Sequence, residues 1–364
     1  MRTGAADLLL DTLGRSDQET AGRWSAVDTR GLDRLVTHEG CAIWLSRRLR
    51  ELGAEPPAEF SRWLDRRVRE DTAKNLMVDA EADALLALLS DRDVPHVFLK
   101  GVAWRLRGGS PLAGARPLHD VDVLVPESRA PDVWNALVAR GYTRVLPEDH
   151  GFVIEHHLPA LFAPGGVSVE LHTSTTHHGR AADSWNRIWP GAVTLARGGR
   201  TTKVPAMTEM LWQTVEHAVH DRTSGFRLRR WLDAVVALRS GEPIRWPDVA
   251  LRLTTGEVAD PDAARAWLGA AAALAGESIP GEVVGSVAAF GVRGALRWRL
   301  AVAATRPLDS RVAIPLLEEG TRGALGWPLS PSAPHRSRYV RARHRLASAA
   351  ARAWYRGWSA LHPR

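Results

Sequence analysis

The stretches Phe98-Leu99-Lys100-Gly101 and His119-Asp120-Val121-Asp122-Val123-Leu124-Val125 decide the fold of this chain. The first is typical of a buried strand that ends in a turn, and the second of a strand reached through a short helix. Successive side chains of a strand point to opposite faces of its sheet. The two aspartates therefore share one face, while the alternating valines face the core.

Asp120 and Asp122 place two carboxylates side by side on that strand. Neighbouring carboxylates repel each other, and a cation between them relieves this repulsion. Hard oxygen ligands select Mg²⁺ or Mn²⁺, and the usual partner of such a pair is a polyphosphate. The spacing therefore favours a divalent-metal site. The alternative is that both are exposed carboxylates of an edge strand.

A third carboxylate follows in an alternating run at residues 167–172. This run is entered through the Pro-Gly-Gly turn at residues 164–166, which predicts a hairpin with residues 152–162 as the partner strand. Within the run, Glu170 and His172 share one face. If this strand lies beside the aspartate strand, Glu170 completes a three-carboxylate cluster. The alternative for Glu170 is a solvated strand residue.

Lys100 is unusual because only three of the 48 basic residues are lysines, the others being Lys74 and Lys203. It directly follows a buried strand, where α/β folds bind their ligands, and this favours phosphate binding. The alternative is a solvated turn residue. Arg116, four residues before Asp120, has the chemistry to clamp a phosphate bidentately. Its alternative is an ordinary loop arginine in an arginine-rich protein.

Histidines are dense in the same part of the chain. Histidines beside a phosphate site bind anions or act as acids. The alternative is that they are polar residues of the hairpin. The residues concerned are His150, His156, His157, His172, His177 and His178.

Composition bounds the class of protein. The chain has 364 residues, enough for two or three domains, with 45% hydrophobic and 24% charged residues, which is typical of a globular protein. Its single cysteine, Cys41, excludes a disulfide framework and a cysteine zinc site. We expect a cytoplasmic protein with no membrane span, since the sequence has neither a long apolar run nor a signal-peptide pattern at its start. The net charge of +7 reflects a general arginine bias, so we do not expect a nucleic-acid partner.

The hydrophobic pattern divides the chain into four parts. Residues 1–92 are typical of helices, residues 93–204 alternate strands and helices, and residues 205–319 return to a helical pattern. Residues 320–364 indicate a linker followed by a basic amphipathic helix. The sequence thus predicts an α/β (α+β) protein with a small mixed sheet flanked by helical regions.

Two helices frame the predicted sheet. Residues 60–89 indicate one long helix, or two helices broken near Asn75. Residues 127–140 form the clearest crossover helix, ended by Gly141.

Together these motifs resemble the uncharacterised nucleotidyltransferases of the DNA polymerase β-like superfamily. The resemblance rests on Lys100-Gly101, the Asp-x-Asp strand at 120–122 and the Glu-Leu-His strand at 170–172. Residues 75–89 are similar to the helix that precedes the Lys-Gly strand in that family. Downstream, His217 and the Arg-Leu-Arg-Arg-Trp-Leu-Asp run at 227–233 are similar to a helical segment of the family. The wider superfamily has a Gly-Ser loop where this chain has Lys-Gly, so its mode of holding the triphosphate is not carried over.

The resemblance implies transfer of a nucleoside monophosphate from an NTP, such as ATP, to an acceptor. It implies Mg²⁺ or Mn²⁺ held by the catalytic carboxylates Asp120, Asp122 and Glu170, with Glu170 as general base in an alternative role. It also implies nucleotide-phosphate binding by four further residues, which are Lys100, Gly101, Arg116 and His172.

The acceptor is not specified by any residue. Relatives are often found beside peptide natural-product pathways, so a peptide natural product or a small metabolite is the candidate. Two alternatives stay open because a fold does not fix its function. One is a catalytically inactive module that binds a nucleotide or a peptide. The other is a related phosphate or sugar transferase on the same scaffold.

Overall fold

The computed structural model describes residues 5–14, 18–108, 114–144, 157–175, 181–220, 227–258 and 260–284. The chain divides into two compact units. One comprises Met1–Val68, Val215–Arg239 and Ala259–Arg364, and the other comprises Arg69–Thr214 and Ser240–Val258. The predicted linker and basic helix at 320–364 lie outside the described residues.

The first unit is helical in its described part. A left-handed Gly40, at φ 63°, separates α3 from α4, so the helical pattern in this region becomes two helices. The stacked rings of Trp231 and Trp267, 4.6 Å apart, join α10 to α12. Its helices are α1 (Ala5–Gly14), α2 (Gln18–Trp24), α3 (Leu32–Glu39), α4 (Ala42–Leu52), α10 (Leu228–Leu238), α12 (Pro261–Ala275) and α13 (Gly281–Val284).

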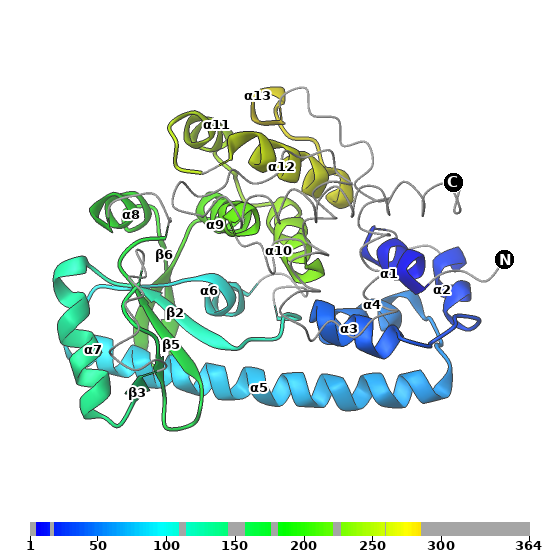
Figure 1. The fold of residues 1–364 in the computed structure, drawn as a ribbon, viewed down its shortest axis with the longest axis horizontal. Helices are drawn as coiled ribbons and strands as arrows, with labels where there is room; N and C mark the ends of the chain where they lie inside the picture. The colour runs from blue at the N-terminus through cyan, green and yellow to red at the C-terminus, as the bar shows by residue number, and fades with distance from the viewer. Residues whose placement is uncertain are drawn as a thin grey trace, which may run out of the picture. The chain divides into compact units, whose positions relative to one another are not determined.

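The second unit contains a five-stranded mixed sheet in the order β1-β2-β5-β4-β3. Figure 1 shows its strands β2 and β5 side by side. Its central strands β2 and β5 are parallel, and the other neighbouring pairs are antiparallel. The predicted mixed α/β fold is thereby confirmed. The strands are β1 (Val97–Phe98), β2 (Asp120–Leu124), β3 (Thr143–Arg144), β4 (Leu161–Phe162) and β5 (Ser168–His172).

The connection from β2 to the parallel β5 carries the predicted crossover helix. It begins as a single turn, η1 (Glu127–Arg129), and continues as α7 (Ala130–Ala139), which contacts β5. Gly141 follows at φ 89°, a conformation that favours glycine. The chain then reaches β5 through the β4–β5 hairpin, whose Gly166 has φ 83°. Of the predicted partner strand, residues 152–156 lie outside the described residues.

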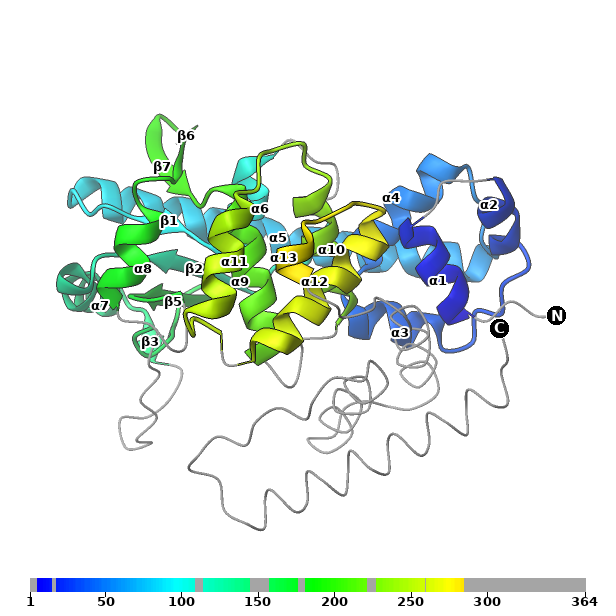
Figure 2. The ribbon, with the colours of Figure 1, turned by 90° about the horizontal axis from the view of Figure 1, so that it is seen from above.

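Helices cover this sheet, and a second hairpin lies beside it. The strands β6 (Val193–Arg197) and β7 (Arg200–Val204) form a separate two-stranded sheet that contacts β1 (Figure 2). The long helix predicted at 60–89 is a single helix without a break near Asn75. The remaining helices are α5 (Ala58–Asp91), α6 (Lys100–Arg107), α8 (Ala181–Ile188), α9 (Met207–His220) and α11 (Trp246–Thr254). Within the part of the chain that is described, no helix combines the length and the apolarity that crossing a membrane requires.

Candidate active site

The register of β2 and β5 aligns their polar side chains. Asp122 pairs with Glu170 and Leu124 pairs with His172 along the two parallel strands. Because side chains alternate along a strand, Asp120, Asp122, Glu170 and His172 all belong to one face of the sheet. The opposite face is apolar and buried, as the valine pattern predicts. The expectation that the glutamate strand lies beside the aspartate strand is therefore correct.

Three of these side chains form a compact polar group. One ligand atom each of Asp122, Glu170 and His172 lies within 4.8 Å of the other two. His172 Nε2 lies 2.8 Å from Asp122 Oδ1 and 3.4 Å from Glu170 Oε2. This group contains His172, for which the predicted role was phosphate binding. It does not include Asp120, for which the predicted role was metal binding.

Asp120 lies two positions before Asp122 on the same face. Its burial, and then the charge of Asp122, raise the pKa of the Asp120 carboxyl, while Lys100 and Arg116 act in the opposite direction. Asp120 is thus close enough to feel the charges of the group. Its role as a metal ligand stays a prediction.

Lys100 contacts the group from the β1 side of β2, opposite to β5. Its Nζ lies 2.6 Å from Asp122 Oδ1 and 3.7 Å from Glu170 Oε2. Lys100 follows β1 at the start of α6, and its φ is +46°, an uncommon value for a residue with a side chain. The preceding Leu99 N–H donates to the Asp122 carbonyl at 2.9 Å, which fixes the lysine backbone beside β2. Here the ammonium is the counter-ion of two carboxylates, and its contact with phosphate stays a prediction.

These contacts set the charge state of the group. Burial acts to raise the pKa of the Asp122 carboxyl, but Lys100 and the hydrogen bond from His172 hold that pKa well below its usual range. Burial and Lys100 act to lower the pKa of His172, but its hydrogen bonds to Asp122 and Glu170 raise that pKa overall. An ionised aspartate therefore lies between the Lys100 ammonium and the His172 imidazole.

Asp122 also retains an oxygen that nothing described in the protein satisfies. The residue is 1% exposed, and its Oδ2 is buried with no hydrogen-bond partner among the described residues. A buried carboxylate oxygen without a partner is costly, and a bound cation removes that cost. Two carboxylates suit Mg²⁺ and Mn²⁺. An imidazole nitrogen beside them adds transition metals such as Zn²⁺ to the cations that this group suits. The side chains present therefore fit a divalent cation.

Gly101 and Asn75 shape the approach to this group. A Cβ at Gly101 would lie 2.6 Å from Leu118 Cδ2, so glycine lets the Leu118 side chain pack here without moving. Buried Asn75, in α5, holds that segment by donating to the Arg116 carbonyl at 3.0 Å and accepting from the Leu118 N–H at 2.7 Å. The segment places Arg116 near enough to Asp120 for its charge to oppose the rise in the pKa of that carboxyl. This role of Asn75 was not predicted from the sequence, whose only signal was a polar amide within a helical pattern.

One further histidine lies beside the group. His157 Nε2 is 3.9 Å from Glu170 Oε2, and its ring centre is 5.1 Å from that of His172. Burial, and then the neighbouring His172, lower the pKa of His157. The other members of the predicted histidine cluster lie outside the described residues. They are His150, His156, His177 and His178.

A mixed sheet with acidic side chains on neighbouring parallel strands, and a lysine beside them, agrees with the nucleotidyltransferase class predicted from the motifs. A family model described as uncharacterised nucleotidyltransferase matches residues 25–270, and the chain belongs to this family. The match reaches further in both directions than the motifs quoted for the resemblance, which lie between residues 75 and 233. A comparison with curated proteins finds no significant match.

Proposed function

We propose that this protein is a metal-dependent nucleotidyltransferase that transfers a nucleoside monophosphate from an NTP to a small acceptor. The observation that supports this proposal most strongly is the group of Asp122, Glu170 and His172. Their ligand atoms lie within 4.8 Å of one another, and Asp122 Oδ2 is buried without a described partner. Membership of a nucleotidyltransferase family supports the same chemistry.

The residues of the group have separable roles in this proposal. Asp122 and Glu170 would hold the divalent cation together with His172 or Asp120. A cation bound there neutralises triphosphate charge and polarises the reacting phosphate. Asp122 is suited to this role because its depressed pKa keeps it ionised at neutral pH.

Other side chains would bind and orient the nucleotide. The Lys100 ammonium, now 2.6 Å from Asp122, would meet the charge of the β and γ phosphates. Arg116 would add a bidentate contact, and Gly101 would let the backbone approach closely. Positioning and electrostatic stabilisation provide most of the rate in such reactions, so few residues suffice.

Glu170 has the exposure and geometry of a general base. Its side chain is 23% exposed, against 1% for Asp122, so it is the carboxylate of the pair that solvent reaches more readily. As the acceptor oxygen bonds to the α-phosphorus, the bond from this phosphorus to the oxygen that bridges the α and β phosphates breaks, and pyrophosphate leaves. In the alternative role, in which Asp122 holds the cation with the other ligands, the Glu170 carboxylate would take the proton of the acceptor. We propose a peptide natural product or a small metabolite as the acceptor.

A second candidate is a nucleotide-binding module without turnover. Lys100 favours this candidate, because its ammonium already pairs with Asp122 Oδ1. The ammonium thus supplies, beside the carboxylates, a positive charge that could take the place of a metal ion. The two candidates differ in whether nucleotide binding requires metal.

Calorimetric titration of ATP, GTP, CTP and UTP, each with and without Mg²⁺ or Mn²⁺, tests this difference. Pyrophosphate release in the presence of candidate peptide and small-molecule acceptors tests turnover. Metal-dependent binding of one NTP with pyrophosphate release supports the transferase. Metal-independent binding with no release across the acceptors supports the module.

A further inference from the structure

The ring of His172 is held at both nitrogens. Its Nε2 faces Asp122 and Glu170, and its Nδ1 lies 3.3 Å from the Ser174 carbonyl oxygen. His172 is 1% exposed, so the ring orientation is fixed by these partners within the core. Histidines that ligate metals show the same arrangement, in which a second partner fixes the ring and tunes its basicity.

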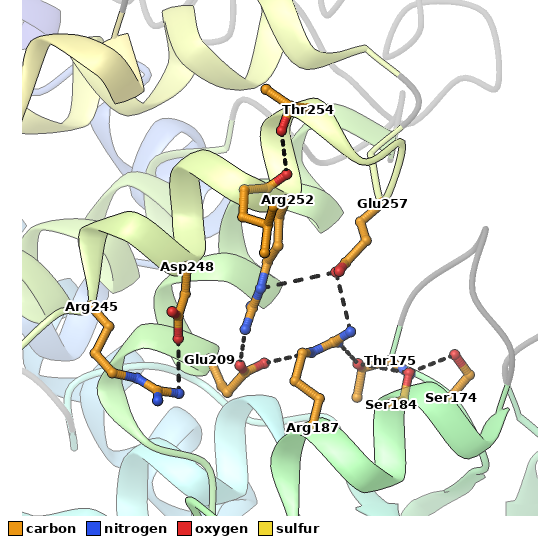
Figure 3. Close-up of polar contacts among 11 residues, drawn as sticks. Ser174, Thr175, Ser184, Arg187, Glu209, Arg245, Asp248, Arg252, Thr254 and Glu257 are labelled. Atoms are coloured by element: carbon orange, nitrogen blue, oxygen red, sulfur yellow. Dashed lines mark hydrogen bonds and ion pairs between the residues drawn. The ribbon is translucent and has the colours of Figure 1, made fainter.

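The Ser174 carbonyl is in turn fixed from α8. Ser184 Oγ lies 2.9 Å from Ser174 Oγ and accepts a hydrogen bond from the Thr175 N–H at 3.1 Å (Figure 3). Ser174 and Ser184 are both fully buried. One hydroxyl of α8 therefore holds Ser174 and Thr175, the second and third residues after His172.

Arg187 holds the same segment one turn further along α8. Its Nη2 donates to Thr175 Oγ1 at 3.2 Å. Its other nitrogens contact Glu209 at 3.4 Å and Glu257 at 3.1 Å (Figure 3). Arg252 donates to the second oxygen of Glu209. Two arginines thus balance two glutamates, so this network adds no net charge beside the site and acts through geometry.

We propose that Ser184 and Arg187 are positioning residues that set the Ser174 carbonyl, and through it the His172 ring, relative to Asp122 and Glu170. The inference rests on the proposed function, because it assigns His172 a place in the metal site. Of the Ser184 and Arg187 contacts described above, none runs to Asp122, Glu170 or His172, and those nearest to them run to the Ser174–Thr175 segment. Their influence on that group therefore passes through the peptide of Ser174.

The first test uses the metal-free protein. We expect a protected imidazole N–H signal of His172 in proton–nitrogen NMR spectra, assigned by its loss in His172→Gln. Ser184→Ala should shift this signal and speed its exchange with solvent. Thr214→Val is the matched control, because it removes a buried hydroxyl that donates to the Met210 carbonyl of its own helix at 2.9 Å. An unchanged His172 signal in Ser184→Ala overturns the inference, and so does an equal shift in the control.

The second test measures Mn²⁺ affinity by electron paramagnetic resonance, without nucleotide. Loss of an outer partner of a metal ligand costs about 10–100-fold in affinity, and we expect about tenfold for Ser184→Ala with no change for Thr214→Val. Arg187→Gln should weaken binding in the same direction, and it replaces the serine variant if that variant does not fold. Wild-type affinity in Arg187→Gln and Ser184→Ala overturns the inference. If the wild type binds no Mn²⁺, the proposed function fails, and the NMR signal still decides the positioning role.

Discussion

Lys100 donates from Nζ to Oδ1 of Asp122 over 2.6 Å, and the aspartate is 1% exposed. A lysine in this place neutralises the carboxylate that a divalent cation would also bind. Two positive charges at neighbouring positions repel each other strongly in a partly dry site. We therefore expect the metal and the ammonium to compete at Asp122 until a triphosphate gives the ammonium another partner.

Lys100→Met removes this competition and should have two opposite effects. Mn²⁺ affinity without nucleotide should increase, because the ligands lose an internal cation. NTP affinity should fall by about 10–100-fold, with a much smaller loss for the matching NMP, because the lysine has no β or γ phosphate to contact there. Electron paramagnetic resonance and calorimetric titration measure the two affinities.

Two further variants make this result specific. Lys100→Arg should restore NTP binding only in part, because a planar guanidinium does not replace a compact ammonium. Lys203→Met is the matched control, since Lys203 contacts the Trp189 ring at 4.1 Å and should leave both affinities unchanged. Equal losses for NTP and NMP in Lys100→Met would show that Lys100 shapes the turn without touching phosphate.

Gly101→Ala tests the close approach between α6 and the 116–118 segment. The new Cβ would lie 2.6 Å from Leu118 Cδ2, and overpacking of this kind costs about 1–3 kcal/mol of unfolding free energy. Leu118→Ala in the same chain should recover part of the loss, which urea denaturation would measure. Gly22→Ala is the control, because no atom lies within 4 Å of its added Cβ and α2 should gain stability. A loss in Gly101→Ala that Leu118→Ala does not relieve would refute the steric explanation.

His96 should make stability depend on pH. Its ring is buried between the Val94 carbonyl at 2.9 Å and Thr202 Oγ1 at 3.1 Å, and burial lowers its pKa from the ordinary value of 6.5. In acid the unfolded chain therefore binds a proton that the folded protein resists, so stability falls as the pH drops below about 6.5.

His96→Gln removes this group and should flatten that part of the pH profile. Urea denaturation between pH 8 and pH 5 gives the comparison. An identical decrease in wild type and variant would mean that other groups cause it.

The sequence predicts the central strands, and the face of the sheet on which their side chains lie, because both depend on local patterns. Alternation places Asp120 and Asp122 on one face, and the turn at 164–166 pairs the Glu170 strand with β4. The predicted long helix and crossover helix depend on 3.6-residue periodicity, which is also local.

The composition of the polar group was harder to predict because it depends on distances across strands. The alternation of side chains alone does not reveal that His172, two residues beyond Glu170, joins Asp122 in the 4.8 Å group, which does not include Asp120. Lys100, which pairs with Asp122, has a positive φ of +46°, and no residue pattern predicts this conformation for a lysine. Asn75 acts across 41 residues of chain, a separation at which local periodicity carries no information.

Metal dependence of nucleotide binding in Asp122→Asn tests the central claim most directly. Asparagine keeps the shape of the side chain but loses the charge that holds a divalent cation. Calorimetric titration of the preferred NTP with Mn²⁺, alongside pyrophosphate release, should show binding and turnover in the wild type and in the exposed-carboxylate control Asp132→Asn. Asp122→Asn should show neither, although its thermal unfolding should stay cooperative. Metal-dependent NTP binding and pyrophosphate release at wild-type levels in Asp122→Asn would contradict the assignment of this site.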